Sequence, residues 1–182
     1  MEQTLGAYTK ALIRRQNHEM AWGVLGRNFS GSAPRRFVAG IAVSSKQKNA
    51  NGQAFDPNGA LALQIPMPLL WDHNFCRPVG KVTGVSVRGD ALHFTAEICN
   101  GGLSSADQVW YGLVKRLQHG VSIGPFDLYE DDGFGGHFRR WGLEEITIAE
   151  AGADPDARIL RVWERSNVVH LHRPSETVYW SE

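Results

Sequence analysis

A serine between two glycines is the first feature of the chain whose residue types and spacing could do chemistry. The stretch Gly120-Val121-Ser122-Ile123-Gly124 fits the pattern Gly-x-Ser-x-Gly, which marks the nucleophile turn of many serine hydrolases. In the α/β-hydrolase fold, a strand ends at that serine and a helix begins just after it. Here helical periodicity precedes Ser122 and strand alternation follows it, so we set that fold aside. Ser122 stays a candidate nucleophile because a catalytic triad is defined by geometry and not by chain order.

A nucleophilic serine needs a base, and the chain has seven histidines. His73 ends the apolar run of "PLLWDHN" and precedes a polar turn, which would place its ring at a sheet edge beside a pocket. The alternative is a histidine that only caps the end of a strand. His119 lies where a helix is expected to end, and its charge would suit the helix dipole. His18 and His93 are interpreted as structural.

Two other groupings of side chains offer different chemistry. Cys76 lies three residues after His73, but a pair so close in sequence rarely places a nucleophile and a base against one substrate. His170 and His172 are two residues apart, so on a strand they share one face and could bind a metal. No third ligand is evident, and exposed histidines on an edge strand are the preferred interpretation. We therefore expect no metal and no nucleotide cofactor.

Composition narrows the class of protein. The chain has 182 residues, which suits a single domain with a real core. Its 19 basic and 19 acidic residues balance, so bulk charge indicates neither nucleic acid nor a membrane surface as partner. The two cysteines, Cys76 and Cys99, are typical of a reducing compartment. No apolar run reaches the roughly 20 residues of a membrane span or resembles a signal peptide, so we expect a cytoplasmic protein.

The order of the predicted elements is strands, one helix, then strands. Alternation predicts strands from Arg36 and after Gly120, and a β-hairpin over 79–98 that turns at Arg88-Gly89-Asp90. Helical spacing predicts a helix over 105–119, with a capping box at its start and Gly120 as its stop. The remaining expectations are a short helix over 3–15, a long loop from Lys46, a strand in "FRRWGLEEITIAEA", a short helix after Pro155 and a closing strand or tail. The fold class is thus mostly β (α+β) and mostly antiparallel.

Three sequence blocks in order resemble the head-maturation (prohead) proteases of tailed phages. They are "MPLLWDHNFCRPVGKVTGVSVRGDALHFTAEI", then a helix leading into "HGVSIGPF", then "LEEITIAEAGADPDARI". The resemblance covers about residues 36–160, and the 49-residue separation of His73 and Ser122 is compatible with it. It implies a serine endopeptidase related to the herpesvirus assemblins, with an antiparallel β-barrel-like core packed by a few helices. With the composition of the two ends, it predicts an N-terminal arm at 1–34, which we expect to be flexible, a protease domain at 35–160 and a C-terminal strand or tail at 161–182.

The resemblance assigns roles to individual residues. Ser122 is the nucleophile, His73 is its general base, and Glu145, in the block Glu-φ-Ser-φ, is the third member. Strand alternation sends Glu145 and Thr147 to one face, where a carboxylate could hold the imidazole. Competing carboxylates for the third place are Asp72, Glu144 and Glu150. Thr147 departs from the family's serine, Ala149-Glu150 replaces a more apolar pair, and Gly152 stands where proline is common.

The oxyanion of an acyl-transfer reaction needs fixed donors. Backbone N–H groups near Ile123 and Gly124 are candidates, and Arg139 or Arg140 is another, because related viral proteases use an arginine-bearing loop. The implied substrates are the major capsid protein, the scaffold protein and the protease itself, cut in the host cytoplasm inside the procapsid. A homodimer would match the assemblins. The alternative is a non-catalytic structural or scaffold-associated virion protein that kept the fold.

Overall fold

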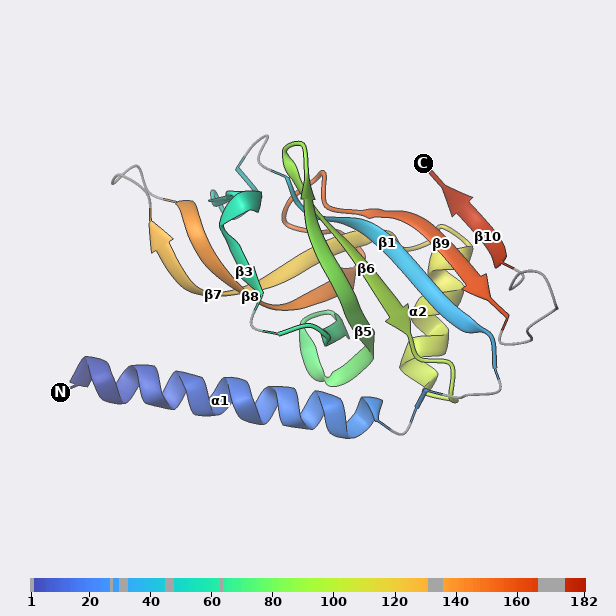
Figure 1. The fold of residues 1–182 in the computed structure, drawn as a ribbon, viewed down its shortest axis with the longest axis horizontal. Coiled ribbons are helices and arrows are strands. Elements are labelled where there is room, and N and C mark those ends of the chain that lie inside the picture. The colour runs from blue at the N-terminus through green and yellow to red at the C-terminus, as the bar shows by residue number, and fades with distance from the viewer. Residues whose placement is uncertain are drawn as a thin grey trace.

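One mixed sheet dominates the computed structural model of the protein, which describes residues 2–26, 28–29, 33–44, 48–62, 64–130, 136–166 and 176–182 (Figure 1). The elements of these residues are α1 (Glu2–Leu25), β1 (Arg35–Ser44), β2 (Ala54–Phe55), the 3-10 turn η1 (Pro57–Gly59), β3 (Ala60–Ala62), β4 (Met67–Trp71), β5 (Asn74–Arg88), β6 (Ala91–Ile98), α2 (Ser104–Val114), β7 (Gly120–Glu130), β8 (His137–Ala149), β9 (Ile159–Arg165) and β10 (Glu176–Ser181). The mostly-β class is therefore confirmed.

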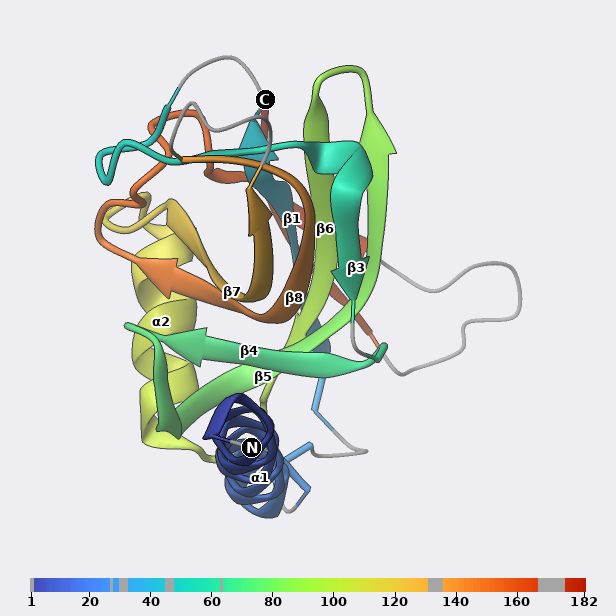
Figure 2. The same ribbon diagram turned by 90° about the vertical axis from the view of Figure 1, so that its left-hand side faces the viewer.

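The sheet is open. Its described strands follow the order β10-β9-β1-β6-β5-β4-β8-β2, and β3 and β7 also pair with β8. Most pairs are antiparallel, as predicted, but β8 runs parallel to β2, β3 and β4. The path ends at β10 on one side and at β2 on the other, so the predicted barrel-like closure is not confirmed. Figure 2 shows β7 and β8 curling strongly above β4 and β5.

The predicted hairpin is confirmed as the pair β5 and β6. Its register runs from Gly80 opposite Ile98 to Arg88 opposite Ala91, and the turn between them is Gly89-Asp90. Gly89 has φ 57°, a left-handed conformation that glycine adopts without steric cost. β5 begins earlier than predicted, at Asn74, because its first residues pair with β4.

Helix α1 lies along the outside of the sheet, beneath β4 and β5 (Figures 1 and 2). It is longer than the predicted helix over 3–15 and runs to Leu25. Ala21 and Leu25 are fully buried near its end, whereas Leu12 and Ile13 are exposed. From residue 9 onward, where the side chains are described, the buried apolar residues of the helix therefore lie near its end. The predicted division at 1–34, 35–160 and 161–182 stays a prediction.

Helix α2 is shorter than predicted and is capped differently. It begins at Ser104 after Leu103, which makes no side-chain capping bond, so the capping box was wrong. Its end is a Schellman motif, in which Arg116 has φ 56°, and the amides of Arg116 and Leu117 donate to the carbonyls of Leu113 and Gly112. The stop at Gly120 was therefore wrong: the helix is already closed at Arg116.

Residues after Pro155 form a strand and not the predicted short helix. β9 lies between β1 and β10, with Phe37 opposite Trp163. The rings of Phe37 and Trp163 stack with their centroids 5.4 Å apart. Pairing on both sides of β9 overrides a local sequence that reads equally well as a helix.

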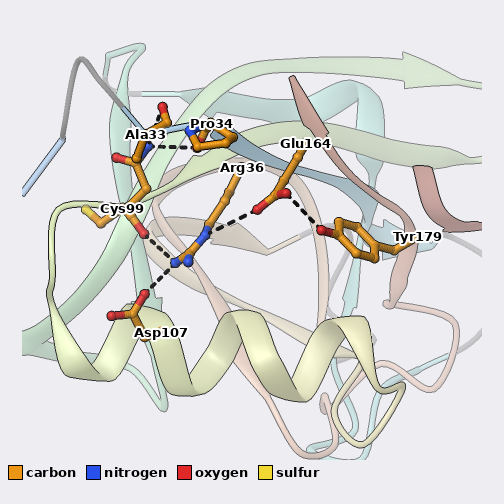
Figure 3. Close-up of polar contacts among 8 residues, drawn as sticks. Ala33, Pro34, Arg36, Cys99, Asp107, Glu164 and Tyr179 are labelled. Carbon is orange, nitrogen blue, oxygen red and sulfur yellow. Dashed lines mark hydrogen bonds and ion pairs between the residues drawn. The ribbon is translucent and has the colours of Figure 1, made fainter. Parts of the chain in front are cut away.

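A half-buried arginine ties α2 to the sheet (Figure 3). Arg36 of β1 donates to Asp107 of α2 over 2.5 Å and to the carbonyl of Cys99 over 3.3 Å. Its Nε lies 3.6 Å from Glu164 of β9, and that carboxylate accepts the hydroxyl of Tyr179 on β10 over 2.8 Å. Four elements therefore meet at one charged cluster. Neither α1 nor α2 combines the length and apolarity that a helix needs to cross a membrane, as judged over the described residues.

Candidate active site

Two side chains from neighbouring strands and one from a turn form a hydrogen-bonded chain. The Nε2 atom of His73 lies 2.9 Å from Ser122 Oγ, and its Nδ1 atom lies 2.6 Å from Glu145 Oε1. Ser122 is on β7, Glu145 is on β8, and His73 is in the turn between β4 and β5. The structure thus brings together the three residues that the sequence proposed as nucleophile, base and acid.

The turn that carries His73 has an unusual backbone. Asp72 and His73 have φ values of 52° and 55°, and they join Trp71 and Asn74, which pair with each other. Two left-handed residues between antiparallel strands form a type I′ turn, in which Asn-Gly is preferred. Asp and His are among the side chains that tolerate this conformation best. The turn therefore aims the imidazole back over the sheet toward β7 and β8.

Strand pairing places Glu145 beside Ser122. In the antiparallel register of β7 and β8, Ser122 lies opposite Thr147, and Gly124 lies opposite Glu145. The Glu145 side chain occupies the space above Gly124, where a Cβ atom would lie only 2.5 Å from Glu145 Oε1. A side chain at position 124 would therefore occupy the space of the Glu145 carboxylate, which explains the glycine there. Glu145 is almost completely buried, with 2% of its surface exposed.

Thr147 contacts both partners of this chain. Its hydroxyl donates to Glu145 Oε2 over 2.6 Å and accepts the backbone N–H of His73 over 3.2 Å. Thr147 and Glu145 share one face of β8, as predicted, while Ile146 and Ile148 point into the apolar core. Both oxygens of Glu145 are thus engaged, one by the imidazole and one by the hydroxyl.

The tautomer of His73 follows from these partners. An ionised carboxylate can only accept hydrogen bonds, so Nδ1 must be the donor and Nε2 is left to accept the Ser122 hydroxyl. The hydrogen bond to Glu145 raises the pKa of His73 above its ordinary value, and partial burial opposes this rise. The charges of Glu145 and Asp72 raise the pKa further.

A cavity of about 150 Å³ opens beside Ser122 and His73. Its apolar wall comes from β1 and β7, and its polar wall comes from the segment 49–53 and from Asp154. The polar wall is fixed, because Asp154 accepts the amide of Ser44 over 2.7 Å and the amide of Ala50 donates to the carbonyl of Ala153 over 2.8 Å. The lining residues are Ala42, Val43, Ser44, Asn49, Asn51, Gln53, Ala54, Phe55, His73, Val121, Ser122, Ile123, Pro125, Ala153 and Asp154.

Comparison with known proteins gives one sequence relative and a structural likeness. No family model matches the chain. A capsid polyprotein of Pseudomonas phage PAJU2 is 28% identical over 137 residues, which are 70% of this chain and 20% of that protein. The chain thus spans about a fifth of the length of the curated relative it matches.

Among solved structures, the KSHV protease in complex with a hexapeptide phosphonate inhibitor has a TM-score of 0.48 and 14% identity, over 69% of this chain and 64% of that chain. The varicella-zoster virus protease has a TM-score of 0.43 and 16% identity, over 69% and 63% of the two chains.

The predicted oxyanion residues lie in two places. Ile123 and Gly124 follow Ser122 directly on β7, and Ile123 lines the cavity. Arg139 and Arg140 are exposed on β8, five or six residues before Glu145. At about 3.3 Å per strand residue, these arginines start up to roughly 20 Å from the acid. Arg140 pairs with Tyr129, seven residues along β7 from Ser122, whereas Ile123 and Gly124 are the next two residues after the candidate nucleophile.

The competing carboxylates are placed elsewhere. Asp72 sits in the turn with its side chain exposed, and Glu150 is exposed after β8. Glu144 lies on the other face of β8, where its Oε1 atom is 3.7 Å from Nε2 of His18 on α1. Burial lowers the pKa of His18, and a hydrogen bond to the Glu144 backbone and the charge of Glu145 oppose this shift. The sequence did not predict this contact, because nothing local to His18 indicates that α1 packs against the sheet.

The remaining candidates do not join the site. Cys76 faces Met20 of α1, with its sulfur 3.2 Å from the thioether. Cys99 is buried, which raises its pKa to about 12, and both cysteines are free. His119 follows α2 and does not end it, and His170 and His172 lie outside the described residues. In the part of the chain that the structure describes, no group of three or more His, Cys, Asp or Glu side chains could hold a metal ion.

Proposed function

We propose that the protein is a serine endopeptidase of the prohead protease type, which processes capsid and scaffold proteins and itself during phage head maturation. The observation that carries this proposal is the chain Ser122–His73–Glu145, with contacts of 2.9 and 2.6 Å beside an open cavity. A hydroxyl, an imidazole and a buried carboxylate in this order form the arrangement that serine peptidases use.

The geometry supports acyl transfer in two steps. Ser122 Oγ attacks the scissile carbonyl carbon while its proton moves to Nε2 of His73, and Glu145 stabilises the imidazolium. The tetrahedral intermediate then breaks its C–N bond, and the same proton passes from Nε2 to the leaving amine. A water molecule attacks the acyl-enzyme with His73 as base. Collapse of the second intermediate breaks the bond to Ser122 Oγ, which takes the proton back, and releases the carboxylic product.

The oxyanion donors are assigned by proximity. Ile123 and Gly124 follow the nucleophile, so their backbone N–H groups are the candidates nearest to the developing charge. Arg139 and Arg140 lie farther along the paired strands and are the second candidates.

The expected substrates and place of action follow from the sequence relative. The matched part of the phage relative belongs to a protein described as a capsid polyprotein. A peptidase related to part of such a chain has capsid and scaffold proteins as its expected substrates and the procapsid in the host cytoplasm as its expected place of action. The assemblin resemblance adds a homodimer to the proposal.

Intact-mass analysis of procapsid proteins tests this function. Capsid and scaffold proteins would be produced together with the wild-type chain or with Ser122→Ala. We expect truncated capsid and scaffold proteins, and a truncated protease, only with the wild type. Identical full-length masses in both samples would reject the processing role.

A further inference from the structure

Thr147 is the buried residue of the site that the triad leaves without a role. None of its surface is exposed, and its hydroxyl is placed between two groups of the hydrogen-bonded chain. It donates its proton to Glu145 Oε2 and accepts the N–H of His73 with a lone pair. A threonine hydroxyl has one proton and two lone pairs, so these two contacts use its proton and one lone pair.

The two contacts constrain the His73 side chain in different ways. The bond to Oε2 fixes the rotation of the Glu145 carboxylate, so that Oε1 stays 2.6 Å from Nδ1 of His73. The bond from the His73 N–H fixes a backbone that is left-handed at two consecutive residues. Such a backbone persists only where its surroundings hold it. One hydroxyl thus sets the direction of both partners of the imidazole.

The sheet places Thr147 where it can do this. It lies opposite Ser122 on β7 and opposite Leu70 on β4, two residues along β8 from Glu145. Side chains two residues apart on a strand share a face, so its hydroxyl reaches the Glu145 carboxylate. Thr147 therefore lies beside the strand that carries Ser122 and beside the strand that leads into the His73 turn.

We propose that Thr147 is a positioning residue of the peptidase, whose hydroxyl orients the Glu145 carboxylate and holds the turn that carries His73. This inference rests on the proposed function for its catalytic consequence. The placement of the imidazole can be measured without any substrate.

Thr147→Val is the deciding variant because valine keeps the branched shape and removes the hydroxyl. The titration of His73 is followed by NMR, with its signals assigned by their loss in His73→Gln. The charged groups near the ring are Glu145 on β8 and Asp72 in the turn. The charge of Glu145 also acts on His18 of α1, and Glu144 lies beside His18 on the other face of β8. We expect the His73 pKa to fall in Thr147→Val, because the hydrogen bond to Glu145 that raises it is loosened.

Labelling of Ser122 by a fluorophosphonate supplies the catalytic readout. Its second-order rate should fall on the order of 10- to 100-fold in Thr147→Val, as for other residues that orient a functional side chain. Thr147→Ser keeps the hydroxyl and should recover most of the rate together with the His73 titration. Thr83→Val, ten residues after His73 and hydrogen-bonded to Thr95, is the control and should change neither quantity.

The outcomes separate this inference from the proposed function. If folded Thr147→Val keeps the wild-type titration and labelling rate, or if Thr147→Ser loses both, the positioning role is wrong. Should Thr147→Val not fold, Thr147→Ala removes the same hydroxyl and is judged by the same two measurements. If Ser122 of the wild type is never labelled, the peptidase proposal fails, while the His73 titration still tests the role of Thr147.

Discussion

At the scale of single residues, the site is a chain of hydrogen bonds that links the side chains of Thr147, Glu145, His73 and Ser122. Thr147 holds Glu145, Glu145 holds Nδ1 of His73, and Nε2 of His73 holds Ser122. Each step fixes the next, which is how a mostly buried acid can orient a half-exposed base. Thr147, which departs from the family's serine, keeps the hydroxyl that contacts Glu145 and the His73 backbone.

The pH dependence of Ser122 reactivity should report the contact between His73 and Glu145. Only neutral His73 can take the serine proton, and its pKa is raised. The fluorophosphonate labelling rate should therefore increase with pH through a midpoint above the ordinary histidine value of about 6.5. In Glu145→Gln the midpoint should move down, because the hydrogen bond and charge that raise it are gone. The plateau rate should fall about 10³- to 10⁴-fold, because an amide that donates to Nδ1 stabilises the wrong tautomer.

Carboxylates that the sequence could not separate from Glu145 are the controls for this experiment. Glu144 faces α1, and Asp72 lies in the exposed turn. The variants Glu144→Gln and Asp72→Asn should therefore keep a labelling rate close to that of the wild type. A large loss in either one, with an unchanged Glu145→Gln, would assign the third place to that residue instead.

Gly124 should tolerate no side chain. A methyl group there would lie 2.5 Å from Glu145 Oε1, so Gly124→Ala must displace the carboxylate from His73. We expect a loss of labelling similar to that of Glu145→Gln and a lower free energy of unfolding, by about 1 to 3 kcal/mol, because the site is overpacked. Gly84→Ala is the matched strand glycine, since its Cβ would meet only Thr95 Oγ1 at 3.2 Å. Normal labelling in Gly124→Ala would show that Glu145 is not held there.

At the scale of elements, tight turns and strand pairing do the positioning. The strand that carries Ser122 and the strand that carries Glu145 were predicted by alternation, and their pairing fixes the distance between the two side chains. The hairpin over 79–98 was predicted for the same reason. The type I′ turn at Asp72-His73 was not, because its two residues are not the Asn-Gly that usually signals it.

Other elements depend on contacts distant in sequence. Helix α2 ends at Arg116, where a left-handed arginine takes the place that glycine usually marks. β9 is a strand because β1 and β10 pair with its two edges. The polar wall of the cavity comes from the segment 49–53, which reads as an ordinary polar loop until its bond to Ala153 is known. These contacts join segments that are distant in sequence, so they cannot be predicted from the local sequence.

Helix α1 offers a test of the same kind. Gly23 lies exposed within its last turns, and a Cβ atom there would have no neighbour within 4 Å. Gly23→Ala should therefore raise the free energy of unfolding by about 0.5 to 1 kcal/mol, because alanine loses less backbone entropy in a helix than glycine. Chemical denaturation measures this change. A flexible arm at residues 1–34 would show no gain.

At the scale of the whole molecule, one open sheet supplies both the site and its support. β8 is paired on both edges and carries Glu145 and Thr147, while α1 packs beneath β4 and β5 (Figure 2). The charged cluster around Arg36 joins β1, α2, β9 and β10 (Figure 3). The strand that holds the acid is thus internal, and the cavity next to Ser122 stays open to a substrate.

The most direct test of the account is covalent labelling of Ser122. The folded wild-type protein is incubated with a fluorophosphonate, and the modified residue is located by peptide mass spectrometry. We expect one phosphonylated residue, Ser122, and no labelling in folded Ser122→Ala or His73→Ala. Absence of labelling in the wild type at every pH, or labelling that persists in His73→Ala, would contradict a peptidase built on Ser122 and His73.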